Sequence, residues 1–260
     1  MEFFDAHAHY DDNKFEEERD ILLKDMYNNG ITKIVSAGYS LEGTKRNIEL
    51  AKKYNFIYTT AGISPNDLND NFEKDIQEIE QLLGANLQSG KILAIGEIGL
   101  DYHYDTDKKI QYEAFRKQID IANKYNLPIV IHTRDAVMDT ITLLKENKVK
   151  EKGIFHCCPL NRELVKEALK LDFYISMAGP ITFKNSKNAN EIIEMVPLDK
   201  ILIETDSPYL APEPVRGTIN NSNNLKYIAR KIASVKGLAI QQVAKATYEN
   251  ALKIYKLNNV

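Results

Sequence analysis

The stretch KILAIGEI, residues Lys91–Ile98, carries apolar residues at consecutive positions with a single acidic residue, Glu97, near its end. A strand with one buried face alternates apolar and polar residues, whereas a continuous apolar run indicates burial on both faces, as in a parallel sheet. The runs PIVIH (Pro128–His132) and KILIE (Lys200–Glu204) share the pattern. Together they predict a parallel sheet covered by helices.

Along the whole chain, eight such runs alternate with segments whose apolar residues have the spacing of a helix. Between runs, apolar residues recur every three or four positions, as from Phe115 to Tyr125 and from Ile240 to Ile254, while Gly30 and Gly237 lie where helices are expected to stop. Eight alternations predict a TIM (β/α)8 barrel, with residues 1–260 as a single domain. The alternative is an open doubly wound sheet, but no glycine-rich phosphate loop follows the first run. The predicted strands are Glu2–His7, Lys33–Ala37, Ile57–Ile63, Lys91–Ile98, Pro128–His132, Gly153–Cys157, Phe173–Met177 and Lys200–Glu204.

Composition limits the classes of function. The net charge of −3 gives no broad basic surface to hold a long nucleic acid, so a nucleic-acid substrate would need a local grip, for example through metal ions. No apolar run approaches the ~20 residues of a membrane span. The two cysteines, Cys157 and Cys158, are adjacent, which favours a reducing compartment, and the N-terminus shows no signal-peptide pattern. We therefore expect a cytoplasmic protein that does not enter a membrane.

Metal-competent side chains fall at the ends of the predicted strands. His7 and His9 end the first strand, and residues two apart on a strand share a face. Active sites of TIM barrels lie at the C-terminal ends of the strands, so these side chains are expected to converge. A single buried histidine is more often a hydrogen-bonded core residue, but that reading does not account for the whole set. The predicted ligands are His7, His9, Glu97, His132, His156 and Asp206.

Glu97 and Asp206 are the predicted catalytic residues. An unpaired carboxylate in an apolar strand is costly, and Glu97 avoids the cost if its two oxygens bridge two cations. We expect His7, His9, Glu97 and Asp206 on one ion, and Glu97, His132 and His156 on the other. Asp206 would orient the attacking water and accept its proton. The alternative for Asp206 is a helix cap, because TDSP is a good helix start.

The motifs DAHAH, AGISP, IGEIGLDYH, LPIVIHTRDA, FHC, TFKN and ETDSPYLAP…RG resemble, in order, those of the TatD-family metal-dependent deoxyribonucleases. The resemblance runs from Asp5 to about Asn250. It implies a TIM barrel with two divalent ions at the rim that hydrolyses phosphodiester bonds of DNA, often from the 3′ end, and it implies the same six ligands. The donor types admit Mg, Mn, Zn or Ni as the ions. The acidic net charge favours DNA that is single-stranded or gripped at its 3′ ends as the partner.

Three departures from the family pattern lie around the substrate. Ser64 stands where the family usually has a histidine associated with substrate phosphate. Cys157–Leu160 replace an aromatic residue and a Ser-Gly turn after FHC, and Asn220–Ser222 replace Asn-Glu-Pro. We therefore expect a changed phosphate grip and a changed loop, with the ligand positions intact.

Substrate contacts are predicted with an alternative for each. Arg134 can hold a phosphate or pair with Asp135 or another acid. Lys184 and Arg216 are phosphate contacts or solvated charges, and His103 contacts substrate or supports the ligands. Tyr209 stacks on a base or packs.

Two other functions remain open at this point. One is hydrolysis of a C–N or C–O bond, although related cyclic-amide hydrolases use a carboxylated lysine where this chain has Glu97. The other is binding without turnover. The sequence does not choose among metals, between DNA, RNA and a small phosphodiester, between exonuclease and abasic-site activity, or among oligomeric states.

Overall fold

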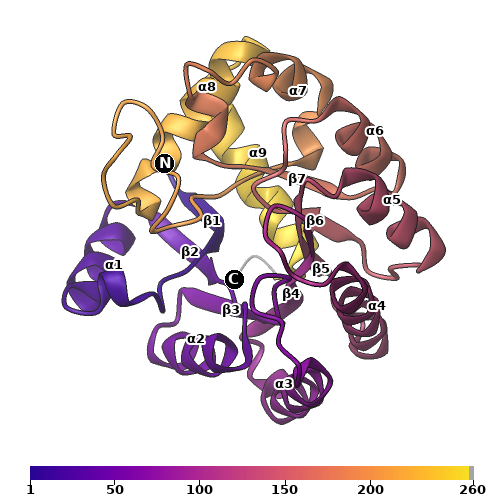
Figure 1. The fold of residues 1–260 in the computed structure, drawn as a ribbon. Helices are drawn as coiled ribbons and strands as arrows, with labels where there is room; N and C mark the ends of the chain where they lie inside the picture. The colour runs from indigo at the N-terminus through magenta and orange to yellow at the C-terminus, as the bar shows by residue number, and fades with distance from the viewer. Residues whose placement is uncertain (258–260) are drawn as a thin grey trace.

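The computed structural model describes residues 1–257, and these contain eight parallel strands in the order β1 to β8. Each strand pairs with the next along the chain, which confirms the TIM barrel and rules out the open doubly wound sheet (Figure 1). The strands are β1 Phe3–Ala8, β2 Ile31–Ser36, β3 Ile57–Ala61, β4 Ile92–Asp101, β5 Ile129–Arg134, β6 Gly153–Phe155, β7 Tyr174–Met177 and β8 Ile201–Ile203.

Helices surround the strands, and α9 lies across the middle of the ring in the view of Figure 1. Side chains of Ser40, Asp107 and Asn161 cap three of them by accepting hydrogen bonds from the first turn. Gly237 ends α8 in the left-handed region with φ 65°, as its position predicted. The helices are α1 Arg19–Asn28, α2 Leu41–Lys53, α3 Phe72–Asn86, α4 Lys108–Tyr125, α5 Val137–Glu146, α6 Arg162–Lys170, α7 Ala189–Met195, α8 Leu225–Lys236 and α9 Ile240–Ile254.

None of the helices in residues 1–257 has the length and apolar character needed to cross a bilayer. The prediction of a cytoplasmic protein stays a prediction.

The strand ends differ from the predicted ones by up to three residues. β4 continues three residues beyond Ile98 to Asp101, because Asp101 still pairs with Arg134 of β5. β6 is shorter than predicted and ends at Phe155, since Cys157 has φ 36° in the left-handed region and turns the chain. β3 likewise ends at Ala61 rather than Ile63. Because β6 ends at Phe155, His156 follows its strand instead of belonging to it.

Two apolar clusters explain why the strand runs are continuous. Neighbouring residues on a strand point to opposite faces. Ile34, Ile95 and Ile129 join the larger cluster, which the helices cover, whereas the adjacent residues Val35, Ala94 and Val130 join a smaller one. The smaller cluster also includes residues of α9. Both faces of the sheet are buried, as the sequence predicted.

The first and last strands meet at a seam of backbone and side-chain hydrogen bonds. The Asp206 N–H donates to the His7 carbonyl at 3.0 Å, and the His9 N–H donates to the Ser207 carbonyl at 2.7 Å. Beside them the buried Asp5 carboxylate accepts from the Thr205 N–H at 2.9 Å and from its hydroxyl at 2.6 Å. This seam sets two predicted ligands, His7 at the end of β1 and His9 just beyond it, against the chain that follows β8.

Candidate metal centre

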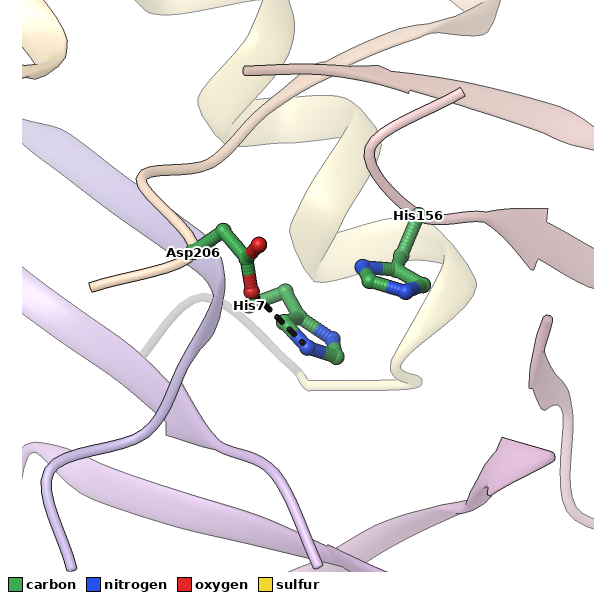
Figure 2. Close-up of side chains that lie close together, drawn as sticks. All are labelled: His7, His156 and Asp206. Atoms are coloured by element: carbon green, nitrogen blue, oxygen red, sulfur yellow. Dashed lines mark ion pairs between the residues drawn. The ribbon is translucent and has the colours of Figure 1, made fainter. Parts of the chain in front are cut away.

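The structure brings all six predicted ligands together at the C-terminal ends of the strands. β1 carries His7, with His9 just beyond it; β4 carries Glu97 and β5 carries His132. Figure 2 shows three side chains from different elements that point toward one another: His7, His156 after β6, and Asp206 after β8. The His7 and His156 rings stack with centroids 4.0 Å apart.

Irregular pairing in two strands directs the ligands inward. On β4, Ile95 pairs with Ile129 and Ile98 with Ile131, so three steps along β4 match two along β5. A similar shift lies between Asp5 and Ala8 on β1. Extra residues of this kind locally re-aim side chains and are common beside active sites. Glu97 and His7 occupy these two irregular stretches.

The first donor set consists of two histidine nitrogens with a carboxylate oxygen of Glu97 and one of Asp206 close to both. His7 Nε2 and His9 Nε2 lie 3.2 Å apart. Glu97 Oε2 is 3.3 Å from His7 Nε2 and 3.8 Å from His9 Nε2. Asp206 Oδ1 is 3.2 Å from His9 Nε2 and 3.7 Å from His7 Nε2. These are the four residues predicted for the first ion, and that assignment stays a prediction, since Asp206 also lies close to His7 and His156 together.

The second donor set uses the other oxygen of Glu97. Its Oε1 lies 3.1 Å from His132 Nδ1 and 3.4 Å from His156 Nε2. The two histidine nitrogens are 3.2 Å apart. One carboxylate therefore faces two separate pairs of histidines, one with each oxygen.

These separations fit a bound metal ion. Four ligands in a tetrahedron with bonds of 2.0–2.1 Å lie about 3.4 Å from one another, close to the values in both sets. Two imidazole nitrogens 3.2 Å apart can share one proton, whereas a cation between them would engage the lone pairs of both. In His7 and His9 it is Nε2 that faces the carboxylates, while the buried Nδ1 atoms have no hydrogen-bond partner in the described residues.

The charges of the cluster keep its carboxylates ionised. Burial works against the charged form of Glu97, but His156 and His132 hold its pKa well below the usual value. Burial likewise opposes the ionised Asp206, whose pKa is nevertheless lowered by the hydrogen bond to His9. Burial disfavours the charged His9 ring, but Asp206 and Glu97 raise its pKa to about 9. Both carboxylates are therefore available to a cation at neutral pH.

Two further carboxylates, which sequence reasoning missed, support the histidines from behind. Asp101 Oδ2 lies 2.9 Å from His132 Nε2. Glu204 Oε1 faces His156 Nδ1 at 3.4 Å, a distance without hydrogen-bond geometry, and accepts a hydrogen bond from the Cys157 N–H at 2.6 Å. Such outer carboxylates fix ring orientation in metal sites. Asp101 and Glu204 each lie at the end of an apolar run in the sequence. A carboxylate in an apolar run is the same signal that pointed to Glu97.

A cavity of about 740 Å³ opens over the donor sets. Its lining contains five carboxylates and one arginine, Arg134, so the residues described give it a strong acidic character. The exposed rings of Tyr104 and Tyr209 also line it. The cavity residues are His9, Asp12, Tyr39, Ser64, Asn66, Asp67, Glu97, Asp101, Tyr104, Thr106, His132, Arg134, His156, Asp206 and Tyr209.

Comparison with known proteins agrees with this site. Residues 4–256 match the model of the TatD-related DNases. The chain belongs to this family. The TatD relative YabD of Bacillus subtilis, an uncharacterized metal-dependent hydrolase, is 39% identical over 257 residues, covering 98% of this chain and 99% of the relative. MJ1582 of Methanocaldococcus jannaschii, also an uncharacterized metal-dependent hydrolase, is 35% identical over 256 residues and covers 98% of both chains.

Solved structures show the same fold. YJJV, a TatD homolog from Escherichia coli, superposes with a TM-score of 0.90 at 23% identity, covering 98% of each chain. With the family match and the metal-dependent relatives, this TatD chain is a metal-dependent hydrolase. Its clustered histidines and carboxylates are the residues that could hold the metal.

Of the four predicted substrate contacts in this TatD site, only Arg134 lines the cavity. Its guanidinium lies 5.6 Å from the centroid of the Tyr104 ring. The predicted alternative, pairing with Asp135, is not seen, because Asp135 lies 3.5 Å from His103 instead.

His103, Lys184 and Arg216 are exposed and do not line the cavity. The Arg216 guanidinium lies 4.2 Å from the centroid of the Phe183 ring. Tyr209 lines the cavity and donates a hydrogen bond to Asp12 at 2.8 Å.

The structure also places three further residues discussed in the sequence analysis. No helix starts after Asp206 in the described chain before the short 3-10 turn Ser222–Asn224, so the helix-cap alternative for Asp206 is wrong. Ser64 lies on the cavity wall and donates to Asp67 at 2.8 Å. Ser222 donates to Asp5 at 2.6 Å and so belongs to the seam rather than to the cavity.

Proposed function

We propose that this metal-dependent hydrolase cleaves phosphodiester bonds of DNA, acting on single strands or 3′ ends. The observation that carries the proposal is Glu97, whose Oε2 faces His7 and His9 while its Oε1 faces His132 and His156. That arrangement suits two divalent cations side by side, whether Mg, Mn, Zn or Ni. The family of TatD-related DNases supports DNA as the substrate.

The six ligands supply the chemistry of the centre. When bound, a pair of divalent ions lowers the pKa of water and neutralises charge on phosphoryl oxygens. In our proposal Asp206 acts as the general base, since its carboxylate is ionised at neutral pH and lies beside the donor set with its Oδ2 making no hydrogen bond in the described residues. Asp101 holds the His132 ring through a hydrogen bond, and the Glu204 carboxylate faces the His156 ring from behind.

The cavity walls suit a nucleotide once cations are bound. Arg134 offers a planar fork of donors to a phosphate oxygen. The exposed rings of Tyr104 and Tyr209 offer faces on which a base can stack. Because the remaining charged lining is acidic, we expect DNA binding to depend on metal, in agreement with the net charge of −3.

The test is cleavage of 3′-labelled single-stranded DNA by metal-stripped protein with Mg²⁺, Mn²⁺ or Zn²⁺ added in turn. Glu97→Ala and Asp206→Ala are assayed alongside, with Asp105→Ala as a control at an exposed position. We expect stepwise shortening that needs added metal, persists in the control and is lost in both site variants. If protein shown to hold two ions per chain cleaves no DNA, the proposal is wrong, and a small ester or amide becomes the substrate to test.

A further inference from the structure

The loop after β3 forms one wall of the cavity and is held rigidly. The Ser64 N–H donates to the Tyr39 carbonyl at 2.7 Å, and the Asp67 N–H donates to the Ser64 carbonyl at 3.0 Å. The buried Ser64 hydroxyl then donates to Asp67 Oδ2 at 2.8 Å. The Asp67 carboxylate is therefore fixed in position although its side chain is exposed to the cavity.

This wall presents hydrogen-bond acceptors. Asp67 Oδ1 makes no hydrogen bond with any described residue, so it is available to a ligand. Next to it, Asn66 uses its Nδ2 to donate to Asp101 Oδ2 at 3.0 Å, which leaves its amide oxygen as the free polar atom. A ligand group beside Asp67 must therefore donate a hydrogen bond, and an anionic group there meets a like charge.

The net charge of the cavity also disfavours a second anionic group beside Asp67. Its lining holds five carboxylates and one guanidinium, so two divalent ions would leave the cavity close to neutral. One phosphodiester, with a single negative charge, is accommodated at the ions. A second phosphate next to Asp67 would add two more negative charges against a carboxylate, which costs binding free energy.

We propose that Asp67 is a specificity residue that selects a terminal nucleotide with a free sugar hydroxyl and rejects an end blocked by phosphate. The hydroxyl donates a hydrogen bond to Asp67 Oδ1, and a terminal phosphate is repelled by the same oxygen. This inference rests on the proposed phosphodiesterase function and adds the class of strand end that the cavity admits.

The test compares two oligonucleotides that differ only in a 3′-hydroxyl or a 3′-phosphate end, each cleaved by the metal-loaded protein. We expect wild type to favour the hydroxyl end by about tenfold in kcat/KM. Asp67→Asn should reduce the preference to about twofold, mainly by improving cleavage of the phosphate end. Ser64→Ala, which frees the carboxylate, should reduce it in part, and Asp70→Asn, an exposed control outside the cavity, should leave it unchanged.

A gain on the phosphate end separates selectivity from a structural role, since misfolding lowers both rates together. An unchanged ratio in Asp67→Asn overturns the inference. A second measurement keeps the two proposals distinct: binding of thymidine 5′-monophosphate and thymidine 3′,5′-bisphosphate to the metal-loaded protein by calorimetry. If DNA is not cleaved but the monophosphate is preferred only when Asp67 is present, the proposed function fails and the selectivity stands. Equal binding of the two nucleotides overturns the selectivity.

Discussion

Asp101 Oδ2 lies 2.9 Å from His132 Nε2, on the opposite side of the ring from the Nδ1 atom that faces Glu97. The ring thus joins a carboxylate behind the site to the donor set in front of it. Burial opposes the ionised Asp101, but the hydrogen bonds from His132 and Asn66 lower its pKa to about 2. Asp101 is therefore a charged acceptor that fixes which nitrogen of His132 remains free for a cation.

The first prediction concerns this pair. Asp101→Asn should weaken metal binding by about 10–100-fold, because an amide holds the His132 ring and its tautomer less firmly. Titration of metal-stripped protein against a chelator of known affinity measures the change. Asp105→Asn, an exposed change of the same kind in the following loop, should leave the affinity as in wild type. Equal affinities for all three proteins would contradict a supporting role for Asp101.

A second prediction concerns Glu204, which is fully buried between strands. Its carboxylate accepts hydrogen bonds from the Cys157 N–H and from the Ser176 hydroxyl. Glu204→Gln puts a donor where an acceptor is needed, and we expect a loss of about 1–3 kcal/mol in the free energy of unfolding. Thermal unfolding should show Tm lower by about 2–12 °C. The exposed Glu194→Gln should not shift Tm measurably, and a Glu204→Gln protein as stable as that control would refute the prediction.

The third prediction links metal to stability. A cation that binds only the folded chain stabilises it by about 2.7 kcal/mol at a hundred times its Kd. At about 2–4 °C per kcal/mol, adding metal to stripped protein should raise Tm by about 5–10 °C. His9→Ala should lose most of that rise, whereas His103→Ala, which changes the one histidine outside the donor sets, should keep it. A metal effect that is identical in both variants would point to binding elsewhere.

The fourth prediction concerns pH and lies away from the cavity. Lys145 and Lys170 each contact Glu167 at 2.5 Å and lower its pKa to about 2. Because the folded pKa lies below the ordinary value of 4.5, the ion pairs stabilise the fold above that pH, and their contribution is lost as the pH falls toward 2. The urea midpoints of wild type and Glu167→Gln should therefore differ at pH 6, differ by less at pH 3, and converge as the pH approaches 2.

Glu163→Gln serves as the comparison on the same helix, since the exposed Glu163 has only a 3.9 Å contact to Lys166. It should match wild type at both pH values. A gap between wild type and Glu167→Gln that keeps its size from pH 6 to pH 3 would contradict the ion-pair explanation.

The sequence predicted the barrel because its strands are buried on both faces, and burial leaves continuous apolar runs such as Lys91–Ile98. It also predicted which six side chains meet, since a parallel barrel places the C-terminal ends of its strands at one rim. Asp101 and Glu204 were missed, although the argument from a buried carboxylate in an apolar run applies to them as it does to Glu97.

Other features depend on contacts that no local pattern reveals. The extra residue in β4 is visible only in its pairing with β5, between Ile95 and Ile98. The loops that carry Lys184 and Arg216 are placed by tertiary packing, and both side chains lie outside the cavity lining. Arg134 lines the cavity because β5 extends to include it, two residues beyond its predicted end.

The seam between β1 and the chain after β8 can form only after the last strand of the barrel has been synthesised. The carbonyl of His7 accepts a hydrogen bond from the backbone N–H of Asp206, which is made some two hundred residues later. The same two residues supply donors to one set of the metal centre. A nascent or cleaved chain that stops short of Asp206 therefore lacks both the closing bonds of the ring and one of the predicted ligands. We therefore expect hydrolysis only from a chain in which the ring can close.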